Sequence, residues 1–78
     1  MARGDDPQLA LGAAIRELRT RRSVTQEDLA HDAGVTVGTL SLIERGQSNP
    51  AWGTVKRIAA ALDTKVSDLA KRAERAGG

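Results

Sequence analysis

The chain has 78 residues, of which 40% are hydrophobic and 28% charged, and its formal net charge is +2. These values are typical of one globular domain and exclude a chain that is disordered throughout. The sequence has no cysteine, which excludes disulfides, thiolate zinc sites and a cysteine nucleophile and favours a cytoplasmic location. No apolar run approaches the ~20 residues of a membrane span, so we expect no membrane association.

The apolar residues are mainly Ala, Leu, Val and Ile, and Trp52 is the only aromatic residue. Such side chains suit closely packed helices better than sheets, and they recur at helical spacing along the chain. We therefore predict an all-α fold. We expect residues 1–78 to form a single domain with its core at about 8–74 and flexible ends at 1–6 and 76–78.

The first predicted helix begins with a cap at Asp6 and continues through Pro7 to the vicinity of Arg22. Three apolar residues follow at positions i, i+4 and i+7, namely Leu11, Ile15 and Leu18. Gly12 lies in the early part of this helix. Because glycine is a weak helix former, we expect this early part to fray.

Residues 25–46 carry the signals of two short helices joined by a tight turn. Thr25 offers an N-cap with an acidic residue at capping-box spacing. Gly34 suits the left-handed end of that helix. Thr36 offers the next cap, and Gly46 ends the second helix. Two short helices joined in this way form a helix-turn-helix signature.

The rest of the chain predicts two further helices. Asn49-Pro50 breaks the chain, and a fourth helix follows with Ala51 as a poor cap. Trp52 falls at the first core position of this helix. A lone aromatic residue does not make the stacking platform of a single-strand binder, so we expect Trp52 to pack in the core. Ser67 is the predicted cap of a fifth helix.

Four motifs follow one another between about residues 11 and 69. They are Thr25-Gln26-Glu27-Asp28-Leu29-Ala30, Ala33-Gly34-Val35-Thr36, Thr39-Leu40-Ser41-Leu42-Ile43-Glu44-Arg45-Gly46 and Ser48-Asn49-Pro50. Together they resemble the Cro/CI-type (XRE) helix-turn-helix family. The resemblance implies a compact five-helix, lambda-repressor-like domain that binds operator DNA as a two-fold dimer. With one histidine, no cysteine, no glycine-rich phosphate loop and little volume to enclose a substrate, we expect neither an enzyme nor a cofactor.

The resemblance also implies roles for individual residues. Residues 37–45 would form the recognition helix in the major groove. The residues expected to face base edges are Val37, Gly38, Thr39, Ser41 and Leu42. The residues expected to contact phosphates of double-stranded DNA are Gln26, Thr36, Arg45, Ser48 and Asn49. Arg19 and Glu44 match a structural pair that links the first and third helices.

Three of the base-facing positions depart from the family's usual pattern. Val37, Gly38 and Leu42 stand where relatives often carry Arg, Lys or Gln, so bidentate contacts to guanine or adenine are excluded at them. Apolar contact with thymine methyls, two hydroxyl groups and Arg45 remain. We expect modest base discrimination, with phosphate contacts and DNA shape carrying more of the specificity. A strict GC-rich operator core would contradict this expectation.

Simpler interpretations stand beside these roles. Val37 and Leu42 could be core residues, and Gln26 could be an ordinary exposed helix residue. The following arginines could form a solvated basic face: Arg16, Arg19, Arg21 and Arg22. His31 has two carboxylates at helical spacing, but a lone histidine beside carboxylates on an exposed helix is usually surface, so we expect no metal site.

The dimer interface and the biological role are less constrained by the sequence. Four candidates for an apolar interface are Trp52, Val66, Leu69 and Ala73, although the last helix could instead close the core of the monomer. We expect the domain to be the whole protein, without a ligand-sensing domain. A transcriptional regulator, such as a phage-type repressor or a controller of a restriction–modification operon, is the favoured function. An antitoxin with a toxin as protein partner, or a protein-interaction module with weak DNA binding, are the alternatives.

Charge is distributed unevenly along the chain. Residues 25–46 carry one basic and four acidic side chains, a net charge of −3, and the segments on both sides are basic. The acidic middle and the apolar recognition face favour the interaction module, whereas the basic flanks favour DNA binding.

Overall fold

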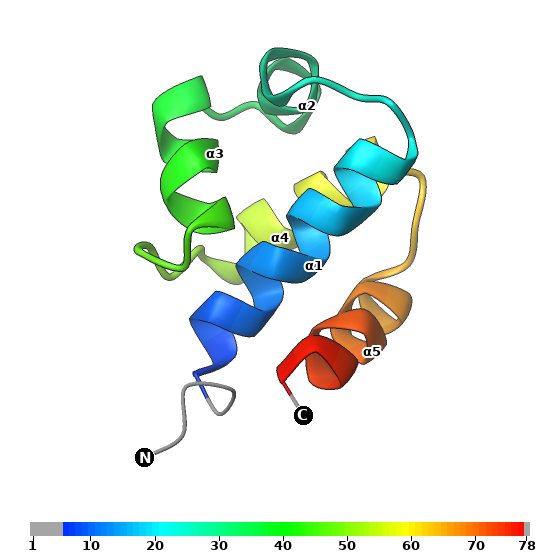
Figure 1. Cartoon of the computed structure of the whole chain (residues 1–78). Coiled ribbons are helices and arrows are strands. Elements are labelled where there is room, and N and C mark those ends of the chain that lie inside the picture. Colours follow the sequence, from blue (N-terminus) through cyan, green and yellow to red (C-terminus); the bar gives the residue numbers. More distant parts are fainter. Residues whose placement is uncertain (1–5, 78) are drawn as a thin grey trace.

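The computed structural model describes residues 6–77, which fold into five helices (Figure 1). The helices are α1 (Pro7–Arg21), α2 (Gln26–Ala33), α3 (Val37–Glu44), α4 (Trp52–Ala61) and α5 (Val66–Gly77). This part of the chain contains no strand, so the all-α prediction is confirmed. Within it, every helix is too short or too polar to cross a membrane.

The helices pack around one aliphatic core. The most extensive contact is that of α5 along α1, while α3 crosses the other side of α1 and α2 packs against α4 (Figure 1). Each helix contributes at least one side chain that is at most 1% exposed: Ile15, Leu29, Leu40, Ile58 and Leu69. The core therefore joins the two helices of the predicted helix-turn-helix to the rest of the domain, and α3 is held at its edge.

The local signals for the helix ends are confirmed. Asp6, Thr25 and Thr36 each accept a hydrogen bond from a backbone N–H two or three residues further on. Gly34 has a φ of 72° and ends α2 in the left-handed conformation. Ala51, at the start of α4, makes no side-chain cap hydrogen bond. The bonds to Asp6, Thr25 and Thr36 satisfy backbone N–H donors that the start of a helix leaves without a partner.

The predicted cap at Ser67 is wrong. Helix α5 begins one residue earlier, at Val66, and the carbonyl of Lys65 accepts the N–H of Leu69 at 3.0 Å. Ser67 is therefore the second residue of the helix. The reason is packing. Val66 and Leu69 both contact the core. Side chains three residues apart lie on the same side of the chain when both residues are helical, so the helix includes Val66.

The expectation of flexible ends falls partly on residues 1–5 and 78, which lie outside the described residues. Asp6 caps α1, and residues 76–77 continue α5.

Gly12 does not mark a weak part of α1, as the sequence suggests. It is buried at the point where α1 crosses α3. A Cβ atom at this position would lie 2.3 Å from the carbonyl oxygen of Ile43 and 2.7 Å from that of Glu44. The missing side chain therefore sets how closely the two helices approach.

Ser23, in the α1–α2 connection, has a φ of 56°, which only glycine adopts without strain. We expect Ser23→Gly to raise the free energy of unfolding by about 0.5–1 kcal/mol, measured by chemical denaturation. The opposite substitution at a matching conformation is Gly34→Ala, where φ is 72° and the nearest atom to the new Cβ would be 3.9 Å away. For Gly34→Ala we expect the free energy of unfolding to fall by about 1–2 kcal/mol. A Ser23→Gly protein less stable than the native chain would contradict the argument.

Candidate nucleic-acid interface

Helix α3 presents one face to the core and the opposite face to solvent. Leu40, Ile43 and Glu44 are buried. Leu42 and Arg45 are exposed on the other side, together with Gly38, which lies one helical turn before Leu42. Leu42 is 39% exposed, so its interpretation as a core residue is wrong.

The first turn of α3 is also exposed. Val37 is 39% exposed, so it too lies outside the core. The Thr36 hydroxyl donates to Oγ1 of Thr39 at 2.9 Å, and its oxygen accepts the Thr39 backbone N–H at 3.0 Å. A phosphate only accepts hydrogen bonds, so Thr36 must release Thr39 before it can donate to one. The hydroxyl proton of Thr39 stays available for an acceptor on a base.

A partly buried polar network joins α1, α2 and α3. The Glu44 carboxylate, with a side chain only 2% exposed, accepts from Nε of Arg19 at 2.7 Å and from the second guanidinium nitrogen at 3.1 Å. Nε2 of Gln26 donates to the same carboxylate at 2.9 Å, and Arg19 also donates to the carbonyl of Val24 at 3.0 Å. This bidentate pair fixes α3 against α1. Gln26 is therefore neither simply solvated nor wholly free to bind a phosphate.

A polar hollow of about 520 Å³ lies beside this network. The residues that line it are Arg16, Arg19, Thr25, Gln26, Ser41, Glu44 and Arg45. Because Arg19 and Glu44 neutralise each other, the positive charge of the hollow comes from Arg16 and Arg45. The start of α2, where backbone N–H groups and the helix dipole favour an anion, borders it. The hollow thus combines charge and donors suited to a phosphate.

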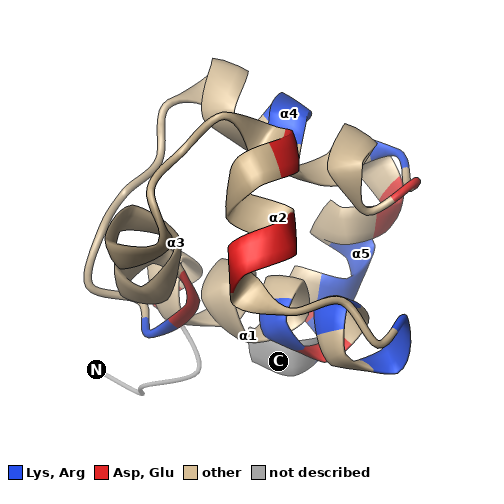
Figure 2. Cartoon of the chain, turned by 90° about the horizontal axis from the view of Figure 1, so that it is seen from above, with Lys and Arg blue, Asp and Glu red and all other residues tan. Residues whose placement is uncertain are grey.

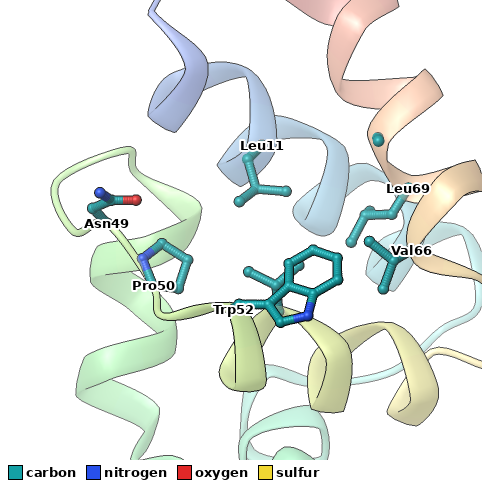
Figure 3. Close-up of a pocket in the computed structure, with 8 residues that line it drawn as sticks. Leu11, Asn49, Pro50, Trp52, Val66 and Leu69 are labelled. Atoms are coloured by element: carbon teal, nitrogen blue, oxygen red, sulfur yellow. The ribbon is translucent and has the colours of Figure 1, made fainter.

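The predicted site residues divide into three places in the structure. Gln26, Ser41 and Arg45 meet in the polar hollow. Thr36 lies at the other end of α3. Ser48 and Asn49 belong to the α3–α4 loop, and Asn49 lines a different, apolar hollow (Figure 3). The predicted phosphate ligands therefore do not form one cluster but flank α3 along its length.

The four arginines of the predicted basic face have separate surroundings. Arg16 borders the polar hollow and Arg19 is bonded within the network. Arg21 lies at the α1–α5 groove with Arg72, whose guanidinium pairs with Glu17 at 2.9 Å. Arg22 lines a crevice that also contains two aspartates. Of the four, Arg16 and Arg19 line the hollow of the candidate interface, and only Arg16 brings a charge that Glu44 does not neutralise.

Arg57 forms hydrogen bonds that the sequence did not predict. Its Nε donates to the carbonyl of Ala33 at 3.0 Å, and its terminal nitrogen donates to the Thr54 hydroxyl at 3.3 Å. A cation at the last carbonyl of a helix complements the helix dipole, so Arg57 ties the end of α2 to α4. The partners are 24 residues apart, and no local pattern signals such a contact.

Trp52 is not in the core: it is 64% exposed, and the prediction that it packs there is wrong. As the first residue of α4, it has a side chain that tilts toward the helix N-terminus, beyond the buried part of the helix. It borders an apolar hollow of about 370 Å³ (Figure 3). The residues that line this hollow are Leu11, Asn49, Pro50, Trp52, Val55, Val66, Leu69 and Ala70.

The structure also corrects the list of interface candidates on α5. Leu69 is 0% exposed and forms part of the monomer core, so its placement in a dimer interface is wrong. Val66 and Ala73 are partly buried against the same core. The last helix thus closes the core of the monomer, and Trp52 and Val66 present the accessible apolar surface beside it.

Charge on the surface follows the helices. Figure 2 shows acidic residues on α2 and basic residues on α4, whereas α1 and α5 carry both signs with basic residues in the majority. Since the carboxylate of Glu44 is neutralised by Arg19, the acidic character of residues 25–46 rests on Glu27, Asp28 and Asp32. Among residues 6–77, no three His, Asp or Glu side chains are grouped as a metal ion would require.

Comparisons with known proteins agree with this geometry. The sequence profile of a family described as "Helix-turn-helix domain" matches residues 10–75. An uncharacterized HTH-type transcriptional regulator of Archaeoglobus fulgidus is 36% identical over 55 residues, which are 70% of this chain and 79% of that protein. The immunity repressor protein of Bacillus phage phi105 is 36% identical over 61 residues, or 78% of this chain and 42% of the repressor.

Two solved structures have the same fold. The clp gene regulator ClgR of Corynebacterium glutamicum superimposes with a TM-score of 0.89 at 32% identity, covering 92% of both chains. The restriction-modification controller protein C.AhdI of Aeromonas hydrophila superimposes with a TM-score of 0.78 at 34% identity, covering 80% of this chain and 94% of the controller. The chain therefore belongs to the helix-turn-helix domain family, within its Cro/CI type of DNA-binding transcriptional regulators.

Proposed function

We propose that the chain regulates transcription by inserting α3 into the major groove of double-stranded operator DNA. The observation that carries this proposal is the position of the polar hollow directly beside the exposed face of α3, with Ser41 and Arg45 belonging to both. An exposed helix face flanked by phosphate-binding groups suits base contacts in the groove and backbone contacts at its edge. The phage repressor and the gene regulators among its relatives support the same role.

Different residues contact the phosphates and the bases. Arg16, Arg45 and the second N–H of the Gln26 amide hold a phosphate in the polar hollow. Ser48 and Asn49, in the loop that follows α3, contact the backbone at the end of the helix. These contacts fix the register of the domain on the duplex, and the exposed residues of α3 then meet the base edges.

Salt dependence tests the phosphate contacts. Selection from a random duplex library should yield a bound site, and the logarithm of its binding constant should fall steeply with the logarithm of salt concentration. We expect Arg16→Ala and Arg45→Ala each to reduce that slope by about 1. Arg75→Ala, on α5 in the α1–α5 groove, is the control and should leave it unchanged. Failure to bind any duplex at low salt would overturn the proposal and favour a protein-interaction module.

We further propose that two copies bind a palindromic site as a two-fold dimer. A single recognition helix contacts too few base pairs for adequate specificity, and a symmetric dimer doubles the site. The apolar hollow supports an interface of this kind, because an exposed Trp52 beside Val66 offers the large apolar contact area on which interfaces depend.

Trp52 reports on this dimer directly because it is the only tryptophan. We expect its fluorescence to shift to shorter wavelength as the protein concentration rises, in step with dimer formation in sedimentation. Trp52→Ser should weaken the dimer at least tenfold, whereas Leu9→Ser, at a residue 39% exposed on α1, should not. A native chain that stays monomeric both free and on DNA would refute the dimer.

A further inference from the structure

We propose that α3 recognises the 5-methyl group of thymine, which enters a gap in its exposed face above Gly38. This inference rests on the proposed function, because it assumes that α3 lies in the major groove.

Gly38 lies at the centre of the exposed face of α3. The buried residues Leu40, Ile43 and Glu44 define the core side. At 100° per residue, the direction opposite to them passes between Gly38 and Leu42, one turn apart. The helix therefore presents its bare backbone at the position that approaches a partner most closely.

The fold itself does not require a glycine at this position. A Cβ on Gly38 would have Thr36 Oγ1 as its nearest neighbour, at 3.9 Å, an ordinary van der Waals distance. Its φ is not in the positive range, in contrast to that of Gly34 and Gly46. Glycine is also a poor helix former. The space above Gly38 is therefore available to a ligand, not to another part of the chain.

The nearest exposed large side chains of α3, one residue before Gly38 and one turn after it, are apolar. Val37 and Leu42 are each 39% exposed, and neither can donate or accept a hydrogen bond. The hydroxyl of Thr36, which is the nearest polar group, already donates to Thr39. In the major groove, the one apolar group on a base edge is the thymine methyl, and it is small enough to fit where a side chain is missing.

The electrostatic surroundings favour DNA over an apolar protein partner as the occupant. Arg45 lies on the same face of α3 one turn beyond Leu42, and Arg16 joins it in the polar hollow. An apolar strip with two cations at its C-terminal end suits a duplex, whose phosphates line the groove.

Replacing thymine by deoxyuridine tests the proposal, because it removes the methyl group and leaves base pairing intact. In a site selected with the native protein, at least one thymine per half-site should lose about fourfold in affinity on this replacement, the factor expected for one methyl-sized apolar group. At the same position, a 5-methylcytosine·guanine pair should bind more tightly than an unmethylated cytosine·guanine pair.

Gly38→Ala links this effect to the gap. Its Cβ occupies the space of the methyl group, so affinity for the thymine site should fall and the penalty of deoxyuridine should disappear. Gly53→Ala is the matched control, since Gly53 is also the second residue of an exposed helix start and a Cβ there would meet its nearest neighbour at 3.6 Å. Both variants should melt at or above the Tm of the native chain, and only Gly38→Ala should alter binding.

The outcomes separate this inference from the proposed function. If a selected site binds with the expected salt dependence but deoxyuridine changes affinity by less than about 1.5-fold at every thymine, the methyl proposal is overturned and the proposed function stands. A Gly38→Ala protein that binds as the native chain does, with the deoxyuridine penalty intact, also overturns it. If the protein binds no duplex, the proposed function is overturned, and the methyl proposal, which depends on it, is overturned with it.

Discussion

Gly12→Ala is expected to lower the free energy of unfolding by about 3 kcal/mol, at the upper end of the usual cost of overpacking. The new Cβ would lie 2.3 Å from the carbonyl oxygen of Ile43 and 2.9 Å from the carbonyl carbon of Glu44. Both obstacles are backbone atoms, which cannot rotate away as a side chain does. Helices α1 and α3 must therefore separate, and the buried side chains between them lose contact.

Thermal denaturation measures this effect. For a domain of this size each kcal/mol corresponds to about 4–8 °C in Tm, so the loss should be visible in a single scan. Gly53→Ala is the control, since it makes the same change in an exposed helix start without a clash. If Gly12→Ala is as stable as the native chain, α1 and α3 do not cross as closely as the structure shows.

Arg19→Met is expected to cost about 3–5 kcal/mol, because it leaves the buried carboxylate of Glu44 without its cation. Glu44 then keeps only the hydrogen bond from Gln26. The side chains of Arg19 and Glu44 are 12% and 2% exposed, so solvent compensates only in part for the lost partner. Since the pair joins α1 to α3, the loss should also weaken DNA binding by releasing the recognition helix.

A double-mutant cycle separates the pair from its surroundings. Arg19→Met combined with Glu44→Leu should be more stable than Arg19→Met alone, because the unpaired charge is gone. The contrasting pair is Arg72 and Glu17, whose side chains are 28% and 60% exposed. Arg72→Met should cost at most about 1 kcal/mol. Equal losses for Arg19→Met and Arg72→Met would show that burial does not govern the first pair.

The helix ends of this chain are set by local interactions. The caps at Asp6, Thr25 and Thr36, and the left-handed end at Gly34, depend on backbone groups within three residues. The periodicity of the apolar residues identifies the helices for the same reason. The motifs of the helix-turn-helix then identify the family, and with it the expected face of α3.

The features that the sequence did not predict depend on contacts between residues far apart along the chain. Gly12 looked like a weak helix position because its neighbours on α3 are more than 30 residues away along the chain. Trp52 fits the apolar stripe of α4, but the core ends before it and the indole lies over a hollow next to α5. Ser67 has the chemistry of a cap, but the packing of Val66 starts the helix earlier.

By itself, the sequence determined the helices, most of their ends and the family, since these follow from backbone hydrogen bonds, side-chain spacing over a few residues and the motifs of the helix-turn-helix. Only the tertiary structure decided which of those residues act together. It ties Gln26 to Glu44, brings Arg16 and Arg45 to one hollow and leaves the space above Gly38 open. These relations depend on how α1, α2 and α3 pack, and packing is a property of the whole core rather than of any one segment.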